Sequence, residues 1–456
     1  MRIHFIGIGG IGVSALAQYY LAMGHKVSGS DLAASEITDF FKKRGVRVFI
    51  GHKTENINRN VDLVIYSPAV PKDNPELLQA KNYKMKTISY PKALGKLTGQ
   101  YYTIAIAGAH GKSTTTAITS LILVKAGFDP TVIVGTKLKE FGDSNFRVGK
   151  SRYLVVEACE YDGSFLNYDP KIIVVTNIDK EHLDYFKTFK NVKKAFKNFI
   201  LRLPKGGFLV ANGDDPNLKI NLVSNSIELD TKKLVPRFKV KNYSLKQKEA
   251  VTIKEILKIP GEHNVSNALA ALEVARVLKI PDEISFKALS DYKGSWRRFE
   301  IFNKKLKHPN KLKAISYKLI SDYGHHPNEV LATLKAAREK YPNNHSKKLK
   351  SRKIWCIFQP HQYQRTHYLL NDFIKVFQQA PIDAIIITDI YDVAGREEKK
   401  ISRGVSSKKL VEKINKKNIR YFPINEAEKF VKDNIQNGDV LIIMGAGDIY
   451  KLVDKF

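Results

Sequence analysis

The chain has 456 residues, a length that suits about three domains, and an ordinary hydrophobic content of 43%. Its longest apolar runs, residues 384–387 and 440–444, are far too short to cross a bilayer, which excludes a membrane-spanning protein. The formal net charge of +31 comes from scattered lysines without any nucleic-acid-binding motif, so we expect no nucleic acid and no membrane as a partner.

The first residues lead directly into an apolar strand and lack the zones of a signal peptide. Cys159 and Cys356 are the only cysteines, which leaves no disulfide framework and no metal-ligand spacing. Both features predict a cytoplasmic protein, and we expect a monomer or a weak dimer.

Residues 1–97 alternate strands and helices in the pattern of a βαβ domain with a parallel sheet. Gly24 and Gly45 are placed to end its two clearest helices. The expected strands are 3–8, 26–30 and 63–66, and the expected helices are 11–23 and 36–44.

A glycine loop, Gly7-Ile8-Gly9-Gly10-Ile11-Gly12, joins the first strand to the first helix, and Asp31 stands 19 residues beyond Gly12. This is the arrangement of a dinucleotide-binding fingerprint, which taken alone predicts NAD. Because such a loop recognises pyrophosphate through backbone N–H groups, another diphosphate such as UDP fits equally well. Glycines that serve only helix–strand packing are the remaining alternative.

A second glycine loop, Gly108-Ala109-His110-Gly111-Lys112-Ser113-Thr114, lies between a strand at 101–107 and a helix at 115–126. Helix amides, the Lys112 ammonium and the Ser113 hydroxyl suit nucleotide phosphates and Mg²⁺, so the loop predicts ATP. Its glycine spacing is shorter than that of the usual P-loop, because Ile106 stands where the first glycine belongs. A chance glycine turn is the alternative.

This loop opens a central domain, expected over residues 98–294, with strands at 153–157 and 172–176 and a helix at 264–278. Glu157 ends the first of these strands and His182 follows the second, at the sheet edge where ligands bind. The carboxylate suits Mg²⁺, and the imidazole is a candidate ligand for a second ion. A capping or packing role for His182 remains open.

Residues 295–456 alternate again and predict a third α/β domain. Its expected strands are 353–358, 384–388 and 440–444, and its expected helices are 327–340, 369–379 and 407–414.

Several charged residues of the third domain allow a structural interpretation. Arg297 and Arg298 are consistent with a charged linker, and His325 and His326 with surface caps of the helix that Pro327 begins. The densest basic runs, residues 231–258, 304–318 and 347–353, are typical of solvated loops or edge strands.

Eight segments in order resemble the Mur ligases, which are ATP-dependent amide-forming enzymes of peptidoglycan precursor synthesis. Each segment alone is weak, but the series spans nearly the whole chain and is specific. The segments are FIGIGGIGVSALA at 5–17, GAHGKSTTT at 108–116, EACEYDGSF at 157–165, NIDKEHLDYF at 177–186, GEHNVSNALAA at 261–271, WRRFE at 296–300, DYGHHP at 322–327 and FQPHQYQRT at 358–366.

The resemblance implies an α/β fold of three consecutive domains. They are a Rossmann-like UDP-binding domain at 1–97, a P-loop ATPase-like domain at 98–294 and a Rossmann-like amino-acid-binding domain at 295–456. The implied reaction uses ATP to phosphorylate the carboxylate of UDP-N-acetylmuramate, and the amine of L-alanine then attacks the acyl phosphate. A carboxylate is a poor electrophile, so a phosphate leaving group together with positioning and charge neutralisation makes the amide bond accessible.

The resemblance also implies roles for individual residues, with Lys112, Glu157, His182, Arg298 and His325 as the catalytic set. UDP-sugar contacts are Gly9, Gly10, Ile11, Gly12, Ser30, Asp31, Ser67, Pro68 and Ala69. ATP contacts are Gly108, Ala109, His110, Gly111, Lys112, Ser113, Thr114, His263, Asn264, Asn267, Arg298 and Asp322, with Arg297 as a further candidate. Ser113, or Thr114 beside it, Glu157 and His182 hold Mg²⁺, and His325 and Arg365 bind the amino acid.

Two features depart from the family pattern. Some relatives carry an additional arginine where Gln362 stands, which leaves the carboxylate clamp open. The segment 303–316 looks longer and more basic than the corresponding turn, and we expect a surface elaboration because a lysine-rich segment without acidic residues does not form a core.

Two alternatives remain. A ligase that attaches a ready-made tripeptide to UDP-N-acetylmuramate shares both loops, although the segments beginning at Glu157 and Asn177 resemble the alanine-adding enzymes more. A non-catalytic nucleotide-binding protein with a polyanion-binding surface predicts salt-dependent polymer binding and no ATP turnover.

Overall fold

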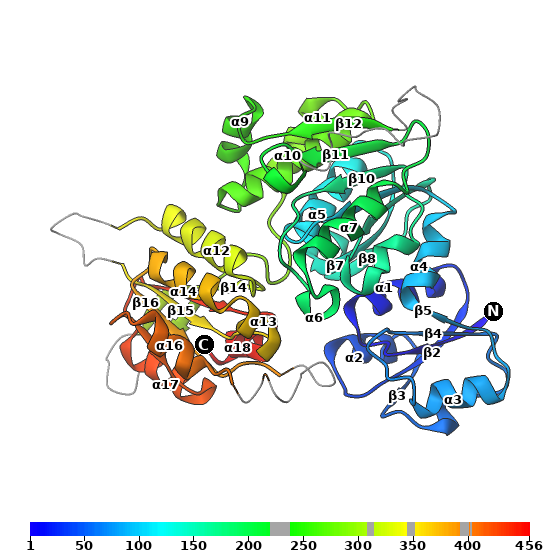
Figure 1. The fold of residues 1–456 in the computed structure, drawn as a ribbon, viewed down its shortest axis with the longest axis horizontal. Coiled ribbons are helices and arrows are strands. Elements are labelled where there is room, and N and C mark those ends of the chain that lie inside the picture. Colours follow the sequence, from blue (N-terminus) through cyan, green and yellow to red (C-terminus); the bar gives the residue numbers. More distant parts are fainter. Residues whose placement is uncertain (219–237, 308–313, 344–351, 393–400, 402–403) are drawn as a thin grey trace. The chain divides into compact units, whose positions relative to one another are not determined.

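The computed structural model describes residues 1–218, 238–307, 314–343, 352–392, 401 and 404–456, which form three sheets with flanking helices (Figure 1). The chain divides into two compact units. The first comprises Met1–Asp179, Lys190–Gln247 and Asn267–Leu289, and the second comprises Lys180–Phe189, Lys248–Ser266 and Ser290–Phe456. No helix among the described residues is long and apolar enough to span a bilayer.

The first sheet is wholly parallel, in the order β3-β2-β1-β4-β5, as the sequence predicts for a βαβ domain. Its first strand ends at Ile6, earlier than expected, because Gly7 adopts a φ of +83° and donates its N–H to Ser30 O. The elements are β1 Arg2–Ile6, α1 Ile11–Ala22, β2 Lys26–Asp31, α2 Glu36–Lys42, β3 Arg47–Ile50, η1 Thr54–Asn56, β4 Leu63–Tyr66, α3 Pro75–Asn82, β5 Thr87–Ser89 and α4 Tyr90–Thr98.

The second sheet has the order β12-β11-β10-β6-β9-β7-β8 and is parallel except for the edge strand β8. Its first helix begins at Lys112 rather than at residue 115, because Gly111 with a φ of +84° turns the chain directly into the helix. The elements are β6 Tyr102–Ala107, α5 Lys112–Lys125, β7 Thr131–Leu138, η2 Lys139–Phe141, β8 Ser144–Arg147, β9 Tyr153–Glu157, η3 Tyr161–Asn167, β10 Ile172–Val175, α7 Phe189–Ile200, β11 Phe208–Asn212, β12 Lys239–Tyr243, α10 Glu262–Val277 and α11 Asp282–Asp291.

The third sheet has the order β13-β14-β18-β15-β16-β17 and is parallel except for the edge strand β13. Successive residues of its central strand β15 enter opposite cores: Cys356 and Phe358 pack on one face, Trp355 and Ile357 on the other. The remaining elements are α6 Leu183–Phe186, α9 Glu249–Ile256, β13 Glu300–Leu306, β14 Ile315–Asp322, α12 Pro327–Lys340, β15 Ile354–Phe358, α13 Tyr363–Tyr368, α14 Leu370–Gln379, β16 Ala384–Ile387, α16 Ser407–Ile414, β17 Ile419–Tyr421, α17 Ile424–Asn434, β18 Val440–Met444, η4 Asp448–Lys451 and α18 Leu452–Lys455.

The basic runs are more ordered than the sequence predicts. β12 and β13 are edge strands, as expected, but α9 is a helix that the sequence analysis did not predict. The ends of the segment 303–316 form strands, and Ile315 is only 4% exposed in the core, so the expectation of a purely surface segment was wrong there. Residues 231–237, 308–313 and 347–351 of these runs lie outside the described residues.

Candidate functional site

The first glycine loop lies at the carboxyl ends of β1, β2 and β4, where the strand order reverses direction. Gly10 is the residue before α1 and has no side chain that could cap the helix amides. Asp31 Oδ2 accepts the N–H of Gly9 at 2.8 Å, and a Cβ at Gly9 would lie equally close to this oxygen. Ser67 lies against Gly7, and the next two residues, Pro68 and Ala69, are exposed. The structure therefore brings the loop, Asp31 and the 67–69 turn together.

Ser30 takes a different place from these residues. Its side chain is fully buried, and its hydroxyl donates to Glu76 Oε2 at 2.7 Å. Only its carbonyl faces the loop, where it accepts the N–H groups of Gly7 and Ile8. Ser30 thus supports the glycine loop from behind.

A buried polar network around Glu76 underlies this edge and has no signature in the sequence. The two carboxylate oxygens accept from Ser30, Asn56, His4 and His52 over 2.7–3.2 Å. Burial by itself raises the pKa of Glu76, but the hydrogen bonds from His4, Ser30 and Asn56 together hold it below the ordinary value. The network fixes the carboxylate beneath β2.

The second glycine loop is held by the segment that follows β10. Asn177 accepts the N–H of Ala109 through its carbonyl, at 3.0 Å, and that of His110 through its side chain, at 2.9 Å. Gly108 has a φ of +141°, and a Cβ there would lie 2.0 Å from Thr176 Oγ1. The glycine is required both for the backbone conformation and for this close approach.

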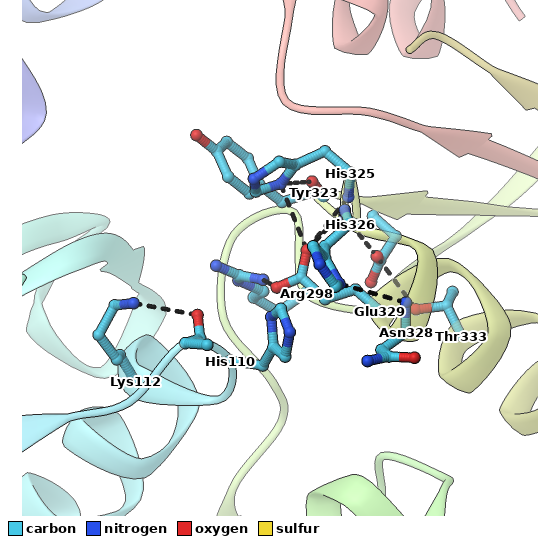
Figure 2. A network of polar contacts seen from close by, with 12 residues as sticks. His110, Lys112, Arg298, Tyr323, His325, His326, Asn328, Glu329 and Thr333 are labelled. Carbon is cyan, nitrogen blue, oxygen red and sulfur yellow. Dashed lines mark hydrogen bonds and ion pairs between the residues drawn. The ribbon is translucent and has the colours of Figure 1, made fainter. Parts of the chain in front are cut away.

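Lys112 folds back over its own loop (Figure 2). Its Nζ donates to Gly108 O at 2.6 Å and to Ala109 O at 3.1 Å, and it pairs with both carboxylate oxygens of Glu160 at 3.0 and 3.2 Å. Burial opposes the charge, but the negative potential of Glu160, Cys159 and Glu157 raises the pKa of Lys112 above its ordinary value. Lys112 is therefore a largely buried cation paired with Glu160, a residue that was not singled out in the sequence.

Glu157 and Asn267 border the same loop. Glu157 ends β9, and its Oε2 accepts the N–H of Gly135 at 2.8 Å. The Oδ1 of Asn267, on α10, lies where a Cβ of Gly111 would come within 2.2 Å. Ser113 and Thr114 occupy the first turn of α5, with both side chains nearly buried. The first unit thus joins the loop, a carboxylate and an amide at one edge.

In the second unit, His325 and Arg298 lie beside Glu329, in the first turn of α12 (Figure 2). Glu329 Oε2 accepts the N–H of His325 at 3.1 Å, and its Oε1 lies 3.9 Å from Arg298. His326 caps α12 in a capping box with Glu329, but at 3% exposure it is not the surface histidine that the capping hypothesis described. Burial, followed by the charge of Arg365, lowers the pKa of His325 to about 3, so its imidazole is neutral.

Arg297 and Asp322 serve the fold of this unit. Arg297 donates to Gly445 O and, at 3.2 Å, to Gly447 O, and it lies over the ring of Tyr450. Asp322 accepts from Gly324 N at 2.8 Å, Phe299 N at 2.9 Å and Thr333 Oγ1 at 3.2 Å. Burial raises the pKa of Asp322 against the opposing effect of Arg298. Arg298 stays partly exposed and lies over the ring of Tyr323.

Arg365 forms a buried ion pair within the second unit. Its Nη2 lies 3.1 Å from Glu181 Oε2, and its Nη1 contacts His361 Nδ1 at 3.1 Å. Burial alone would raise the pKa of Glu181, but Arg365 and the histidines around it hold it well below the ordinary value. A small pocket that opens to solvent adjoins this pair, lined by Lys180, His182, Leu183, Asp184, Gln362, Arg365, Tyr368 and Leu369.

Gln362 forms part of this pocket with an unusual backbone. It precedes α13 with a φ of +71° and a ψ of 130°. Its N–H is bound by Tyr391 O at 2.9 Å, and its carbonyl accepts from the N–H and hydroxyl of Thr366. The side chain is 5% exposed at the position where an additional arginine was expected in some relatives.

The remaining predicted residues lie at helix starts. His182 precedes α6 with a φ of +54°, and its N–H bonds to Glu181 Oε2. Asn264 donates to Pro260 O at 2.7 Å, and burial lowers the pKa of His263 to about 4. Glu157 belongs to the first unit and His182 to the second.

Three family models match consecutive parts of the chain. They describe the Mur ligase family catalytic domain at residues 2–102, the Mur ligase middle domain at 106–275 and the Mur ligase glutamate ligase domain at 297–447. A UDP-N-acetylmuramate–L-alanine ligase of Acetivibrio thermocellus is 40% identical over 474 residues, which cover 100% of this chain and 95% of the relative. The enzyme of the same name from Clostridium acetobutylicum is 40% identical over 471 residues, covering 100% and 97%.

Solved structures show the same similarity. The UDP-N-acetylmuramate-alanine ligase of Thermotoga maritima is 25% identical with a TM-score of 0.75, over 100% of this chain and 98% of that one. A murein peptide ligase of Psychrobacter arcticus, 20% identical with a TM-score of 0.71 over 100% and 98%, shares the fold.

Proposed function

This chain belongs to the Mur ligase family, and we propose that it joins L-alanine to the carboxylate of UDP-N-acetylmuramate with conversion of ATP to ADP and phosphate. The observation that carries this proposal is the 40% identity, over the whole chain, to relatives named for that reaction. The two glycine loops agree with it, because one reaction then needs a UDP-linked acid and a phosphoryl donor. We also propose domain boundaries near residues 97 and 294.

The first loop binds the UDP-sugar. Amides of Gly9, Gly10, Ile11 and Gly12 hold the diphosphate at the start of α1. Asp31 and the turn of Ser67, Pro68 and Ala69 contact the uridine and the sugar, and Ser30 acts through its carbonyl. The convergence of these groups at the carboxyl ends of three strands supports this assignment.

The second loop binds ATP. Gly108, Ala109, His110, Gly111, Ser113 and Thr114 surround the phosphates, Lys112 bridges the β and γ phosphates, and His263, Asn264 and Asn267 contact the adenosine. Arg298 contacts the phosphates, and Asp322 holds the turn that carries Arg298. The support is the amide-rich start of α5 together with the fixed charge of Lys112.

A divalent cation fits the acidic edge of this loop. Glu157 uses only one carboxylate oxygen for Gly135, so the other can bind Mg²⁺, with Ser113 as a second oxygen donor and His182 as the ligand of a further ion. When bound, Mg²⁺ neutralises phosphate charge during transfer. Lys112 supplies the protein's own positive charge to the same phosphates.

The third domain presents the amino acid. We infer that Arg365 binds the carboxylate of L-alanine and that neutral His325 orients the amine for attack on the acyl phosphate. The new C–N bond forms as the phosphate leaves. The pocket beside Arg365 supports this assignment.

The test is phosphate release from ATP with UDP-N-acetylmuramate and, in turn, L-alanine, glycine, L-serine or the tripeptide. We expect the highest kcat/KM with L-alanine. Release with the tripeptide alone would favour the tripeptide-adding ligase, and no release with any acceptor would contradict a ligase. Lys112→Ala serves as the control, because it should abolish release while UDP-sugar binding persists.

A further inference from the structure

Tyr90 lies where the first glycine loop meets the acidic edge of the second sheet, within one compact unit. Its ring covers Gly12: a Cβ on Gly12 would lie 2.7 Å from the Tyr90 Oη and 3.0 Å from its Cζ. The Tyr90 phenol therefore occupies the space that a side chain at residue 12 would need. This explains the glycine without reference to a ligand.

The other neighbours of Tyr90 lie beside the second glycine loop. Burial raises the pKa of the phenol above the ordinary value, and the nearby Cys159 and Glu157 act in the same direction. Tyr90 is thus a neutral hydroxyl between the two loops. A neutral donor can approach a phosphate without adding to the charge around Glu157.

Tyr90 belongs to the helix α4, which packs against the segment between β9 and β10 of the second sheet. This packing holds Tyr90 in position. Tyr90 is the first residue of α4, which contacts η3 at Gly95, where an added Cβ would lie 2.3 Å from Asn167 O. At the end of the helix, Thr98 Oγ1 accepts the N–H of Asp169 at 3.0 Å. The hydroxyl of Tyr90 itself has no hydrogen-bond partner within the described part of the chain.

From these observations we propose that Tyr90 donates its phenolic hydrogen bond to the diphosphate of the UDP-sugar held at Gly12. The inference rests on the proposed function and assigns a further binding residue to the same site. A phenol over the first turn of α1 completes an anion site that otherwise consists of backbone amides. It also ties the position of the diphosphate to the helix that is fixed to the second sheet.

The test is calorimetric titration of the full chain with UDP alone, for wild type and Tyr90→Phe. Phenylalanine keeps the ring over Gly12 and removes only the donor. A hydrogen bond to a charged group corresponds to about 10- to 100-fold in affinity, so we expect the UDP Kd to rise by that factor. The Kd for ADP, which binds the other loop, should not change.

Tyr20→Phe is the matched control, because Tyr20 lies on α1 and packs against Phe5 and His25, away from the loop. It should bind UDP as wild type does. Equal UDP affinity in Tyr90→Phe and wild type overturns the inference alone. A loss seen with UDP-N-acetylmuramate but not with UDP also overturns it, in favour of a contact to the sugar. Failure of wild type to bind UDP contradicts the proposed function and this inference together.

Discussion

Glu160 sets the electrostatics of the second glycine loop, because both of its oxygens pair with the Lys112 ammonium. Glu160→Gln keeps the shape of the side chain and removes its charge. We expect about three- to tenfold tighter ADP binding in the absence of Mg²⁺, since Lys112 is then free for phosphate and a nearby negative charge is gone.

Calorimetric titration with ADP in the presence of a chelator measures this effect. Glu140→Gln, which removes an exposed carboxylate of the same unit, controls for the change in net charge. Unchanged or weaker ADP binding in Glu160→Gln would mean that Glu160 does not compete with the nucleotide for Lys112.

Glu76 should make folding stability depend on pH. Its folded pKa lies below the ordinary value of 4.5, so its contribution is complete above pH 4.5 and is lost as the pH falls through the folded pKa. Glu76→Gln should destabilise the protein by about 1–3 kcal/mol at pH 7, and this difference should shrink below pH 4.5.

Urea unfolding of wild type and Glu76→Gln between pH 7 and pH 4 checks the expectation. A stability difference that is constant over this range would show that the carboxylate charge is not what the network stabilises.

The same residues show which parts of the site a sequence reveals. The placement of the glycine loops, Lys112 and Glu157 at the sheet edges could be predicted, because it follows from local spacing beside a strand and a helix. The surroundings of Ser30 and Asp322 could not be predicted. Glu76, the partner of Ser30, is distant in the sequence, and Phe299 binds Asp322 only through its backbone N–H. Glu160 was missed for the same reason: its role is defined by Lys112, 48 residues earlier.

At the scale of elements, the contact between α4 and η3 leaves no room for an added methyl group. Gly95→Ala would place a Cβ 2.3 Å from Asn167 O, a backbone atom that cannot move aside cheaply. We expect a loss of about 1–3 kcal/mol in the free energy of unfolding, as for overpacked cores. Chemical denaturation measures it.

Gly99→Ala, four residues later, is the matched control, because its nearest neighbour would lie at 3.5 Å, an ordinary contact. It should change stability little. Equal effects of the two substitutions would indicate that helix propensity, and not the close approach, governs α4.

Element boundaries followed the sequence where a local stop or start exists. The helix 327–340 was predicted without error, because Pro327 can only begin it. α5 was predicted three residues late, because Gly111 with a positive φ turns the chain directly into the helix, and its contact with Asn267 of a distant helix cannot be seen in the local sequence. α9 was missed in a lysine-rich run, because composition alone does not show that Ile253 is buried.

At the scale of the whole molecule, all residues proposed for UDP binding lie in the first compact unit. The second unit has its own cores on both faces of its sheet. We therefore expect more than one calorimetric unfolding transition, with UDP raising the midpoint of the first unit alone. At 100 times its Kd, UDP should add about 2.7 kcal/mol to that unit.

Differential scanning calorimetry with and without UDP measures the effect, with uridine as the control ligand that lacks the diphosphate. A single transition, or equal shifts of all transitions, would show that the two units unfold as one cooperative system.

Gln362 holds a backbone conformation that side chains rarely adopt, at a cost of about 1–3 kcal/mol. Glycine would relieve that strain, so selection for folding stability alone would favour it. A side chain kept in the pocket at this cost in stability indicates a trade-off between folding stability and function. Stabilising substitutions chosen from the fold should therefore avoid this position, where a gain in stability would come with a changed pocket.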